Sequence, residues 1–287
     1  MGRTSDVEVP VFDQGGGEYS DELYHLQPLP ENEYVESLDL VDQAAVDRYH
    51  EQGFLAVRSA MPGSSVDEAL TALRDAARPD SGAQVQYEAS AQQRLDAMSE
   101  LERLAAIRKV VGFVEHSSVL SSIATDPILI SKVEAMLGET SRLYLDQAFH
   151  KPPGGREKPW HQDQLSGIRV PSGVPIVSAW IALDEATLEN GCMCVIRRSH
   201  SLGPRRHVRG RDVQICDEEV SLADGVAVPL RPGGLLFFDG LVHHGTAANR
   251  STRTRRSVQF HYTRASAEDL SLEEYQAVFG VDETATC

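Results

Sequence analysis

The hydrophobic pattern of the chain changes near Gly138. Before this point, apolar residues recur at helical spacing, and Val41, Ala45 and Tyr49 predict a helix that stops at Gly53. The other elements predicted here are a short strand at residues 54–57 and helices at residues 64–78, 92–111, 117–124 and 127–137. We therefore expect a mostly helical first half, spanning residues 38–138.

After Gly138, short apolar runs rich in β-branched and aromatic residues alternate with Gly- and Pro-rich turns. The predicted strands cover residues 142–149, 160–164, 176–183, 192–196, 226–230, 235–238 and 257–263. Strands of this length and spacing predict a sandwich or barrel closed on itself. The expected class is mainly β with flanking α-helices, in one catalytic domain over residues 38–287 whose β-rich core covers residues 139–265. Residues 1–37, rich in Gly, Pro and acidic residues, predict an extended or disordered arm.

The composition and net charge of the chain limit the kinds of molecule that it is expected to bind. The 287 residues are 41% hydrophobic and 24% charged, as in ordinary globular proteins, and carry a formal net charge of −16. That charge argues against a nucleic-acid or anionic-membrane partner, because both require a basic surface. No apolar run approaches the roughly 18 residues of a membrane helix, and residues 1–6 lack the apolar core of a secretory signal. We expect a cytoplasmic location.

Four cysteines are present, at positions 192, 194, 216 and 287. Cys192 and Cys194 are separated by one residue, whereas zinc and redox motifs have two, and no second pair follows. We therefore expect four reduced, structural thiols.

The candidate chemistry lies in His161 and Asp163, together with His244 some eighty residues later. If residues 160–164 form a strand, His161 and Asp163 point to the same face, because alternate side chains of a strand share a face. His244 follows a second predicted strand. Two imidazoles and one carboxylate, with further positions open, form the metal site of non-haem Fe(II) oxygenases. The spacing alone does not distinguish iron from zinc, so a zinc-dependent hydrolase remains an alternative, as does a jelly-roll binding protein without catalysis.

A set of motifs together resembles the phytanoyl-CoA dioxygenase family of Fe(II)- and 2-oxoglutarate-dependent oxygenases. The residues that carry the resemblance are Lys151-Pro152-Pro153-Gly154, Trp160-His161-Gln162-Asp163, Trp180-Ile181-Ala182-Leu183-Asp184, Glu189-Asn190-Gly191-Cys192, Arg198-Ser199-His200, His244-Gly245-Thr246, Asn249, Ser251, Arg255 and Arg256. The resemblance runs from about Gly53 to Thr263 and implies a double-stranded β-helix, the jelly roll of cupin-like proteins. Arg198 departs from the Gly that is common before Ser-His in the family.

The resemblance also implies roles for individual residues. His161, Asp163 and His244 would bind Fe(II), and Arg255 would pair with the distal carboxylate of 2-oxoglutarate, helped by the hydroxyl of Thr246. Further cosubstrate contacts are implied for Gln147, Gln162 and Trp180. With O2, such an enzyme oxidises a small molecule, most often by hydroxylation, and releases succinate and CO2. Because Asp163 is present, oxygenation is implied and halogenation is not.

One basic loop stands out in this acidic chain, at residues 204–211. A solvated loop explains it without a function. Because loops of such barrels often border the pocket, Arg205 and Arg206 are also candidates for binding an anionic group of the substrate. The expected partner is a small molecule, with a secondary metabolite as the class suggested by analogy with the family. The oligomeric state is not determined by the sequence.

Overall fold

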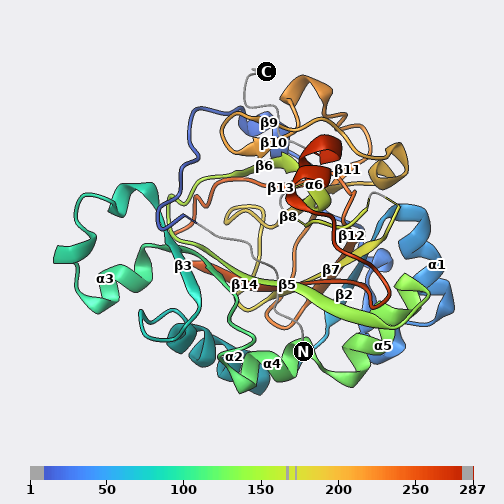
Figure 1. Cartoon of the computed structure of the whole chain (residues 1–287), viewed down its shortest axis with the longest axis horizontal. Helices are drawn as coiled ribbons and strands as arrows, with labels where there is room; N and C mark the ends of the chain where they lie inside the picture. The colour runs from blue at the N-terminus through green and yellow to red at the C-terminus, as the bar shows by residue number, and fades with distance from the viewer. Residues whose placement is uncertain (1–9, 166–167, 172, 280–286) are drawn as a thin grey trace.

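The chain folds into two β-sheets that face each other, and several helices pack on the outer face of one of them, as seen in a computed structural model (Figure 1). The structure describes residues 10–165, 168–171, 173–279 and 287. The helices are α1 (Gln43–Gln52), α2 (Gly63–Ala76), α3 (Glu100–Ala105), α4 (Ser118–Ala124), α5 (Pro127–Leu137) and α6 (Leu272–Phe279). The strands are β1 (Val35–Ser37), β2 (Phe54–Ser59), β3 (Gln84–Tyr87), β4 (Ile107–Val111), β5 (Ser141–Lys151), β6 (Lys158–His161), β7 (Ile176–Ala182), β8 (Met193–Ile196), β9 (Val208–Arg209), β10 (Val213–Gln214), β11 (Gly225–Val228), β12 (Leu235–Asp239), β13 (His244–Thr246) and β14 (Arg255–Arg264).

Eight strands form the larger sheet, in the order β1, β2, β12, β7, β14, β5, β4, β3. All neighbouring strands are antiparallel except β1 and β2. The smaller sheet has the order β11, β8, β13, β6, and its strands are antiparallel throughout. A further short pair, β9 with β10, closes the loop where the basic cluster lies. The mainly β class with a jelly-roll core is therefore confirmed.

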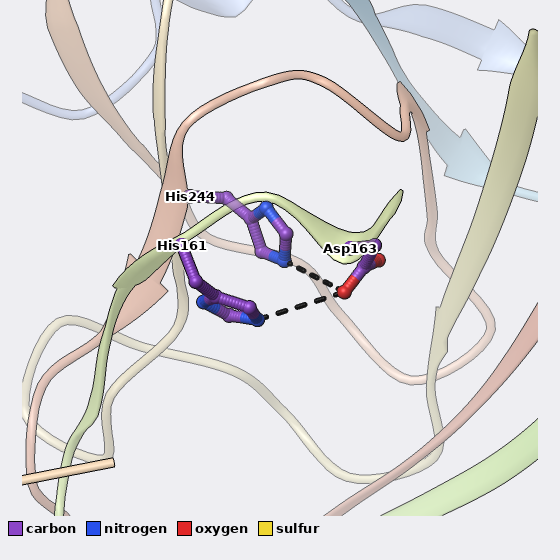
Figure 2. A group of neighbouring side chains, drawn as sticks. All are labelled: His161, Asp163 and His244. Atoms are coloured by element: carbon purple, nitrogen blue, oxygen red, sulfur yellow. Dashed lines mark ion pairs between the residues drawn. The ribbon is translucent and has the colours of Figure 1, made fainter. Parts of the chain in front are cut away.

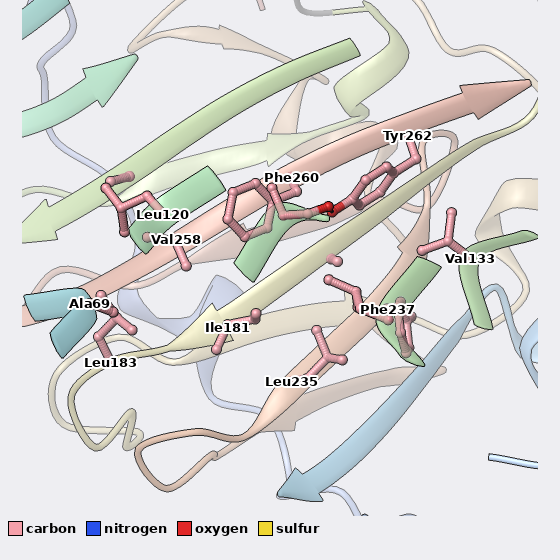
Figure 3. Packing of buried hydrophobic residues seen from close by; sticks show 14 of the residues in the cluster. Ala69, Leu120, Val133, Ile181, Leu183, Leu235, Phe237, Val258, Phe260 and Tyr262 are labelled. Carbon is pink, nitrogen blue, oxygen red and sulfur yellow. The ribbon is translucent and has the colours of Figure 1, made fainter. Parts of the chain in front are cut away.

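The larger sheet is buried on both faces, and its side chains alternate between them. Val258, Phe260 and Tyr262 of β14 point to the face that α1, α2, α4 and α5 cover (Figure 3). The intervening residues point to the space between the two sheets. Burying both faces explains why the central strands β7 and β12 are almost entirely apolar. The polar residues that do occur on the inner face of β14 therefore require a specific role, because a buried polar group is costly without a partner.

The helices begin and end where local sequence signals place them. Asp42 caps α1 by accepting a hydrogen bond from the Ala45 amide, and Gly53 ends it with a φ of 85°. Asp126 and Pro127 begin α5 in the same manner, and Gly138 ends it. These two helices, and the strand that follows Gly53, agree with the sequence analysis.

The predicted helix at residues 92–111 is wrong. This segment instead contains a turn, the short helix α3 and the strand β4, and Leu101, expected on an apolar helix face, is 79% exposed. The run from Ile107 to Val111 pairs with β5, so tertiary strand pairing outweighs the local helical periodicity.

The first nine residues of the predicted arm lie outside the described residues. From Pro10 on, the segment packs against the domain, and Tyr24 and Leu29 are buried. Tyr24 stacks on Trp160 with ring centroids 5.6 Å apart. This part of the chain therefore contributes to the hydrophobic core, although much of it is extended.

The expectation of four reduced cysteines is half wrong. Cys216 and Cys287 form a disulfide, whereas Cys192 and Cys194 are free and buried. The sequence separation of 71 residues left no local signal for this pairing. Among the described residues, no helix has the length and apolar character needed to cross a membrane.

Candidate active site

The two candidate histidines lie directly opposite each other in the smaller sheet. His244 of β13 is the register partner of His161 of β6, and their ring centroids are 4.1 Å apart. Both side chains are almost fully buried. Strand pairing therefore brings two residues that are distant in sequence together at one site.

Asp163 completes the group, although not by the expected route. The strand β6 ends at His161, and Asp163 begins a short 3-10 helix. The turn still directs its Oδ1 atom toward both imidazoles, 3.5 Å from the Nε2 of His161 and 3.4 Å from the Nε2 of His244 (Figure 2). Within the described residues, this is the one group of three His, Cys, Asp or Glu side chains arranged to hold a metal ion.

Hydrogen bonds to the backbone fix both imidazoles in the form that binds a metal. The Nδ1 of His161 lies 2.8 Å from the Pro159 carbonyl, and the Nδ1 of His244 lies 3.0 Å from the Val242 carbonyl. Because a carbonyl can only accept, each Nδ1 carries the proton, and each Nε2 is left with its lone pair toward the shared centre. This is the second contact that metal-binding histidines usually make.

The electrostatics agree with metal binding. Burial, followed by the charge of His244, lowers the pKa of His161 to about 3, so its ring is neutral at pH 7. Burial opposes ionisation of Asp163, but His244, His261 and the hydrogen bonds of the site outweigh it and hold the pKa of this carboxyl well below its usual range. Neutral imidazole and ionised carboxylate are the forms that bind metal ions.

The three side chains lie at the wall of a cavity of about 500 Å³. The larger sheet contributes Gln147, Trp180, Arg255 and Gln259, all on its inner face. The cavity is completed by the N-terminal segment and by the loop around β9 and β10. Its residues from these two segments are Pro10, Asp13, Gln14, Gly15, Arg209, Gly210, Asp212 and Val213.

Arg255 is the most unusual charge in the cavity wall. This residue is 2% exposed, and its guanidinium lies 5.3 Å from the ring centre of Trp180. Among the described residues, its Nε and Nη1 atoms have no hydrogen-bond partner. Burial lowers the pKa of Arg255 to about 10, because water is removed and no carboxylate replaces it. A buried cation in this state fits an anionic ligand with oxygen acceptors.

Thr246 lines the same cavity and is oriented by a lysine. The Lys151 ammonium donates a hydrogen bond of 2.6 Å to the Thr246 hydroxyl and also contacts the Ala247 carbonyl. Burial, followed by the charge of Arg255, lowers the pKa of Lys151 well below its usual value. Because Thr246 accepts from Lys151, its own hydroxyl proton remains available to an acceptor in the cavity.

Lys109 is a second cation at the cavity. Burial, followed by the charge of Lys158, lowers its pKa to about 8. Within the described residues, its ammonium group lies over the ring of Phe149, 5.2 Å from the ring centre. By contrast, Lys158 forms an ion pair of 3.0 Å with Asp212. Lys109 is therefore a cation that an anion in the cavity can neutralise.

Ion pairs join the N-terminal segment to the rest of the cavity rim. Asp13 accepts hydrogen bonds of 2.5 and 2.8 Å from Arg156 and lies 3.3 Å from Arg108. Arg156 also donates a hydrogen bond of 2.9 Å to Asp212, which belongs to the loop opposite. These ion pairs and hydrogen bonds thus join separate segments of the chain at the rim.

Not every residue implied by the sequence lies at the cavity. Gln162 is fully buried and uses its amide to hold loops, donating to the Gly203 and Leu241 carbonyls and accepting from the Arg205 amide. It is not a cavity residue, because a side chain next to His161 in a strand points to the other side. Arg205 and Arg206 are exposed and also lie outside the cavity lining, whereas Arg209 of the same loop contributes to it.

Sequence reasoning missed four polar residues of the site, namely Lys109, Lys151, Ser178 and Gln259. A signal existed for Lys151, because it lies four residues after Gln147 in one strand and so shares its face. For Ser178, a polar residue inside the otherwise apolar strand β7 was the available signal, whereas Gln259 lies in β14 among several other polar residues.

Two largely antiparallel sheets, with a His-x-Asp and a distant His at one cavity, define a jelly-roll protein with a mononuclear metal site. More specifically, residues 49–257 match the family model described as phytanoyl-CoA dioxygenase, and the chain belongs to this family. Its relatives include the 2-aminoethylphosphonate dioxygenase of an uncultured bacterium, 24% identical over 58% of this chain and 63% of that protein. Another is the methylphosphonate hydroxylase of Gimesia maris, 31% identical over 50% of this chain and 53% of that protein.

Solved structures share the fold. The epimerase SnoN, determined in complex with Fe3+, α-ketoglutarate and nogalamycin RO, matches with a TM-score of 0.64. The match covers 85% of this chain and 91% of that one, at 21% sequence identity. The chain spans between 53% and 63% of the length of the first curated relatives that it matches.

Proposed function

We propose that this protein is an Fe(II)- and 2-oxoglutarate-dependent dioxygenase. It would hydroxylate or otherwise oxidise a small molecule and release succinate and CO2. The observation that carries this proposal is Arg255, whose buried Nε and Nη1 atoms have no hydrogen-bond partner among the described residues and which lines the same cavity as the three metal-binding side chains. Membership of the phytanoyl-CoA dioxygenase family supports it.

The metal would be held by the Nε2 atoms of His161 and His244 and by the Oδ1 of Asp163. Two neutral imidazoles and one carboxylate suit ferrous iron and leave positions open for other ligands. When bound, iron together with 2-oxoglutarate and O2 supplies the oxidising chemistry. The protein's own contribution is to position the ligands, to hold the cosubstrate and to enclose the substrate.

The distal carboxylate of 2-oxoglutarate would pair with Arg255. A guanidinium stays ionised even where burial lowers its pKa, and its planar donors match a carboxylate. The Thr246 hydroxyl, oriented by Lys151, would donate to the same carboxylate, and Trp180 would limit the position of the guanidinium. Gln147, on the cavity wall, would contact the cosubstrate or the substrate.

Arg255 also separates this proposal from a zinc-dependent hydrolase. A hydrolase would need the metal and an activated water, and it would have no use for a buried, unpaired arginine. Leaving a charge in this state costs several kcal/mol, on the order of what removal of one partner of a buried ion pair costs. A carboxylate-bearing cosubstrate removes this cost and so accounts for the residue.

Lys109 would pair with a second anionic group in the cavity. Its chemistry fits a carboxylate or a phosphonate, from either the cosubstrate or the substrate. Lys109→Met separates the two sources. If the cosubstrate supplies the group, the substitution weakens 2-oxoglutarate binding without substrate present. If the substrate supplies it, 2-oxoglutarate binding is unchanged and the KM of an anionic substrate rises.

The substrate would be a small molecule bound in the cavity beside the metal, and a secondary metabolite is the class that we propose. The complex of SnoN with nogalamycin RO, an example of such a compound bound to a protein of similar fold, supports this class. The cavity is lined by residues from Pro10 to Tyr275, and we propose one catalytic domain over residues 38–287, with a cytoplasmic location.

Turnover of 2-oxoglutarate without substrate tests the proposal. Many oxygenases with such a site consume the cosubstrate slowly on their own, so succinate formation serves as the readout. We expect succinate release that requires Fe(II) and O2 and that falls strongly in Arg255→Met. Arg253→Met is the control, because Arg253 is exposed on the loop before β14. Equal succinate release with and without Fe(II) would contradict the proposal.

A further inference from the structure

Behind Asp163, on the side away from the two histidines, lies a buried group of polar side chains. Ser178 comes from β7, and Gln259 and His261 come from the inner face of β14. Their exposed fractions are 0%, 3% and 0%. None of them belongs to the three metal-binding residues.

Two of these side chains hold the second oxygen of Asp163. The Ser178 hydroxyl donates a hydrogen bond of 3.1 Å to Oδ2, and the Gln259 amide donates one of 2.8 Å to the same atom. The other oxygen, Oδ1, faces His161 and His244. The two oxygens therefore have different partners. Oδ1 points to the metal position, and Oδ2 accepts hydrogen bonds from Ser178 and Gln259.

The directions of these bonds determine the state of His261. Ser178 gives its only proton to Asp163, so at its 2.9 Å contact with the Nδ1 of His261 it must accept, and Nδ1 carries a proton. The Nε2 of His261 lies 3.1 Å from the amide nitrogen of Gln259 and 3.1 Å from that of Gln147. Amide nitrogens only donate, so Nε2 accepts. The two amide donors share the single lone pair of Nε2, and the directions of all bonds in the group are then consistent.

We propose that His261 is a positioning residue which, through Ser178 and Gln259, holds Asp163 with a single oxygen toward the metal. This inference rests on the proposed function, because it requires a metal ion at His161, Asp163 and His244. The Nε2 atom of His261 also accepts a hydrogen bond from the side-chain amide nitrogen of Gln147. The carbonyl oxygen of that side chain therefore points away from the group formed by Ser178, Gln259 and His261.

The consequence concerns the positions that remain open on the metal. A carboxylate free to rotate can bind with both oxygens and occupy one additional position. A cosubstrate that chelates through two atoms, together with O2, needs three open positions beside the three protein ligands. Holding Oδ2 within the protein keeps these positions open, in the way that partners of metal ligands generally fix ligand geometry.

Binding of Co(II) to the full chain tests this inference, because Co(II) absorption reports both affinity and coordination. We expect the wild type to bind Co(II) and Asp163→Ala to lose it. In Ser178→Ala and Gln259→Met, the Co(II) dissociation constant should rise about 10- to 100-fold, as is usual for partners of metal ligands. The visible spectrum should change as well, because the carboxylate changes its binding mode.

Ser257→Ala is the matched control. Ser257 lies on the same face of β14, is fully buried, and has a hydroxyl without a hydrogen-bond partner among the described residues. Its replacement should leave affinity and spectrum unchanged. Ser178→Thr, which keeps the hydroxyl, should retain most of the affinity. Thermal unfolding of each variant separates loss of folding from loss of ligand orientation.

His261 itself is tested by a double-mutant comparison. If it acts through Ser178 and Gln259, His261→Leu should weaken Co(II) binding in the wild type but add little in the Ser178→Ala, Gln259→Met background. Wild-type affinity and spectrum in Ser178→Ala and Gln259→Met would overturn the inference while leaving the proposed function intact. Failure of the wild type to bind Co(II) would instead overturn the proposed function, and this inference with it.

Discussion

His161 and His244 are direct partners across the β6 and β13 ladder, so the backbone pairing of two strands sets the distance between two imidazoles. Each ring is held by a carbonyl two residues earlier in its own chain segment, Pro159 for one and Val242 for the other. The backbone therefore orients both imidazoles toward one metal position.

The first prediction concerns this metal site. Replacement of His244 by Ala should abolish detectable Fe(II) binding and cosubstrate turnover, because two remaining ligands do not hold the ion. Isothermal titration with Fe(II) under anaerobic conditions measures the binding. His243→Ala is the control, since the neighbouring His243 lies outside the cavity lining. Retention of tight iron binding in His244→Ala would contradict the ligand assignment.

The second prediction concerns Lys151, which orients the Thr246 hydroxyl. Lys151→Met should raise the dissociation constant of 2-oxoglutarate about tenfold, the equivalent of one lost hydrogen bond worth roughly 1.4 kcal/mol. Iron affinity should not change, because Lys151 does not contact the three metal-binding residues. Lys132→Met on α5, whose ammonium donates to the Val41 carbonyl far from the cavity lining, is the control. Unchanged cosubstrate affinity in Lys151→Met would remove this lysine from the cosubstrate site.

The third prediction concerns pH. Burial, followed by the charge of Arg256, lowers the pKa of His150 to about 3. The unfolded chain, with an ordinary His pKa near 6.5, therefore binds more protons than the folded protein between about pH 6.5 and pH 3, and stability falls as the pH falls through this range. His150 should account for about 2 kcal/mol of the stability that the wild type loses between pH 7 and pH 5. The His150→Phe variant should therefore lose about 2 kcal/mol less over the same range.

Urea unfolding at the two pH values measures this difference. The exposed His25 provides the control, because His25→Asn removes an imidazole that is exposed to water in the folded protein as well. A His150→Phe variant that loses as much stability on acidification as the wild type would show that this ring is not buried in a neutral form.

The fourth prediction concerns the cavity rim. Asp13→Ala removes the carboxylate that Arg156 and Arg108 share, and should destabilise the protein by about 1–3 kcal/mol, because a mostly buried charge loses its partner. The N-terminal segment should also become more sensitive to limited proteolysis. Asp67→Ala, on the exposed face of α2, should change neither property. Wild-type stability in Asp13→Ala would mean that Asp212 alone satisfies Arg156.

Much of the fold follows from the sequence, because the strands after Gly138 are buried, apolar and punctuated by Gly and Pro. The segment at residues 92–111 could not be predicted correctly, since its apolar residues recur at helical spacing while the β-branched run Ile107 to Val111 finds a partner in β5. The disulfide of Cys216 with Cys287 was equally out of reach, because it depends on tertiary proximity.

For the site, the three metal-binding candidates and Arg255 meet at one cavity, as the sequence analysis expected, although Asp163 reaches it from a turn. Gln162 does not, because its neighbour His161 takes the inner face of the strand. Lys109 comes from a segment that was expected to be helical, so its place on the inner face could not be foreseen. Residues that act through hydrogen bonds to other residues, such as Ser178 and Gln259, carry no spacing signal.

The central claim is that one cavity binds both ferrous iron and 2-oxoglutarate. An anaerobic titration of metal-free protein with Fe(II), and then with 2-oxoglutarate, tests it most directly. We predict a visible charge-transfer band when the cosubstrate is added, and in Arg255→Met the band should appear only at much higher 2-oxoglutarate concentration. The absence of any band in the iron-loaded wild type, with tight binding of zinc instead, would contradict the proposal and favour a metal-dependent hydrolase.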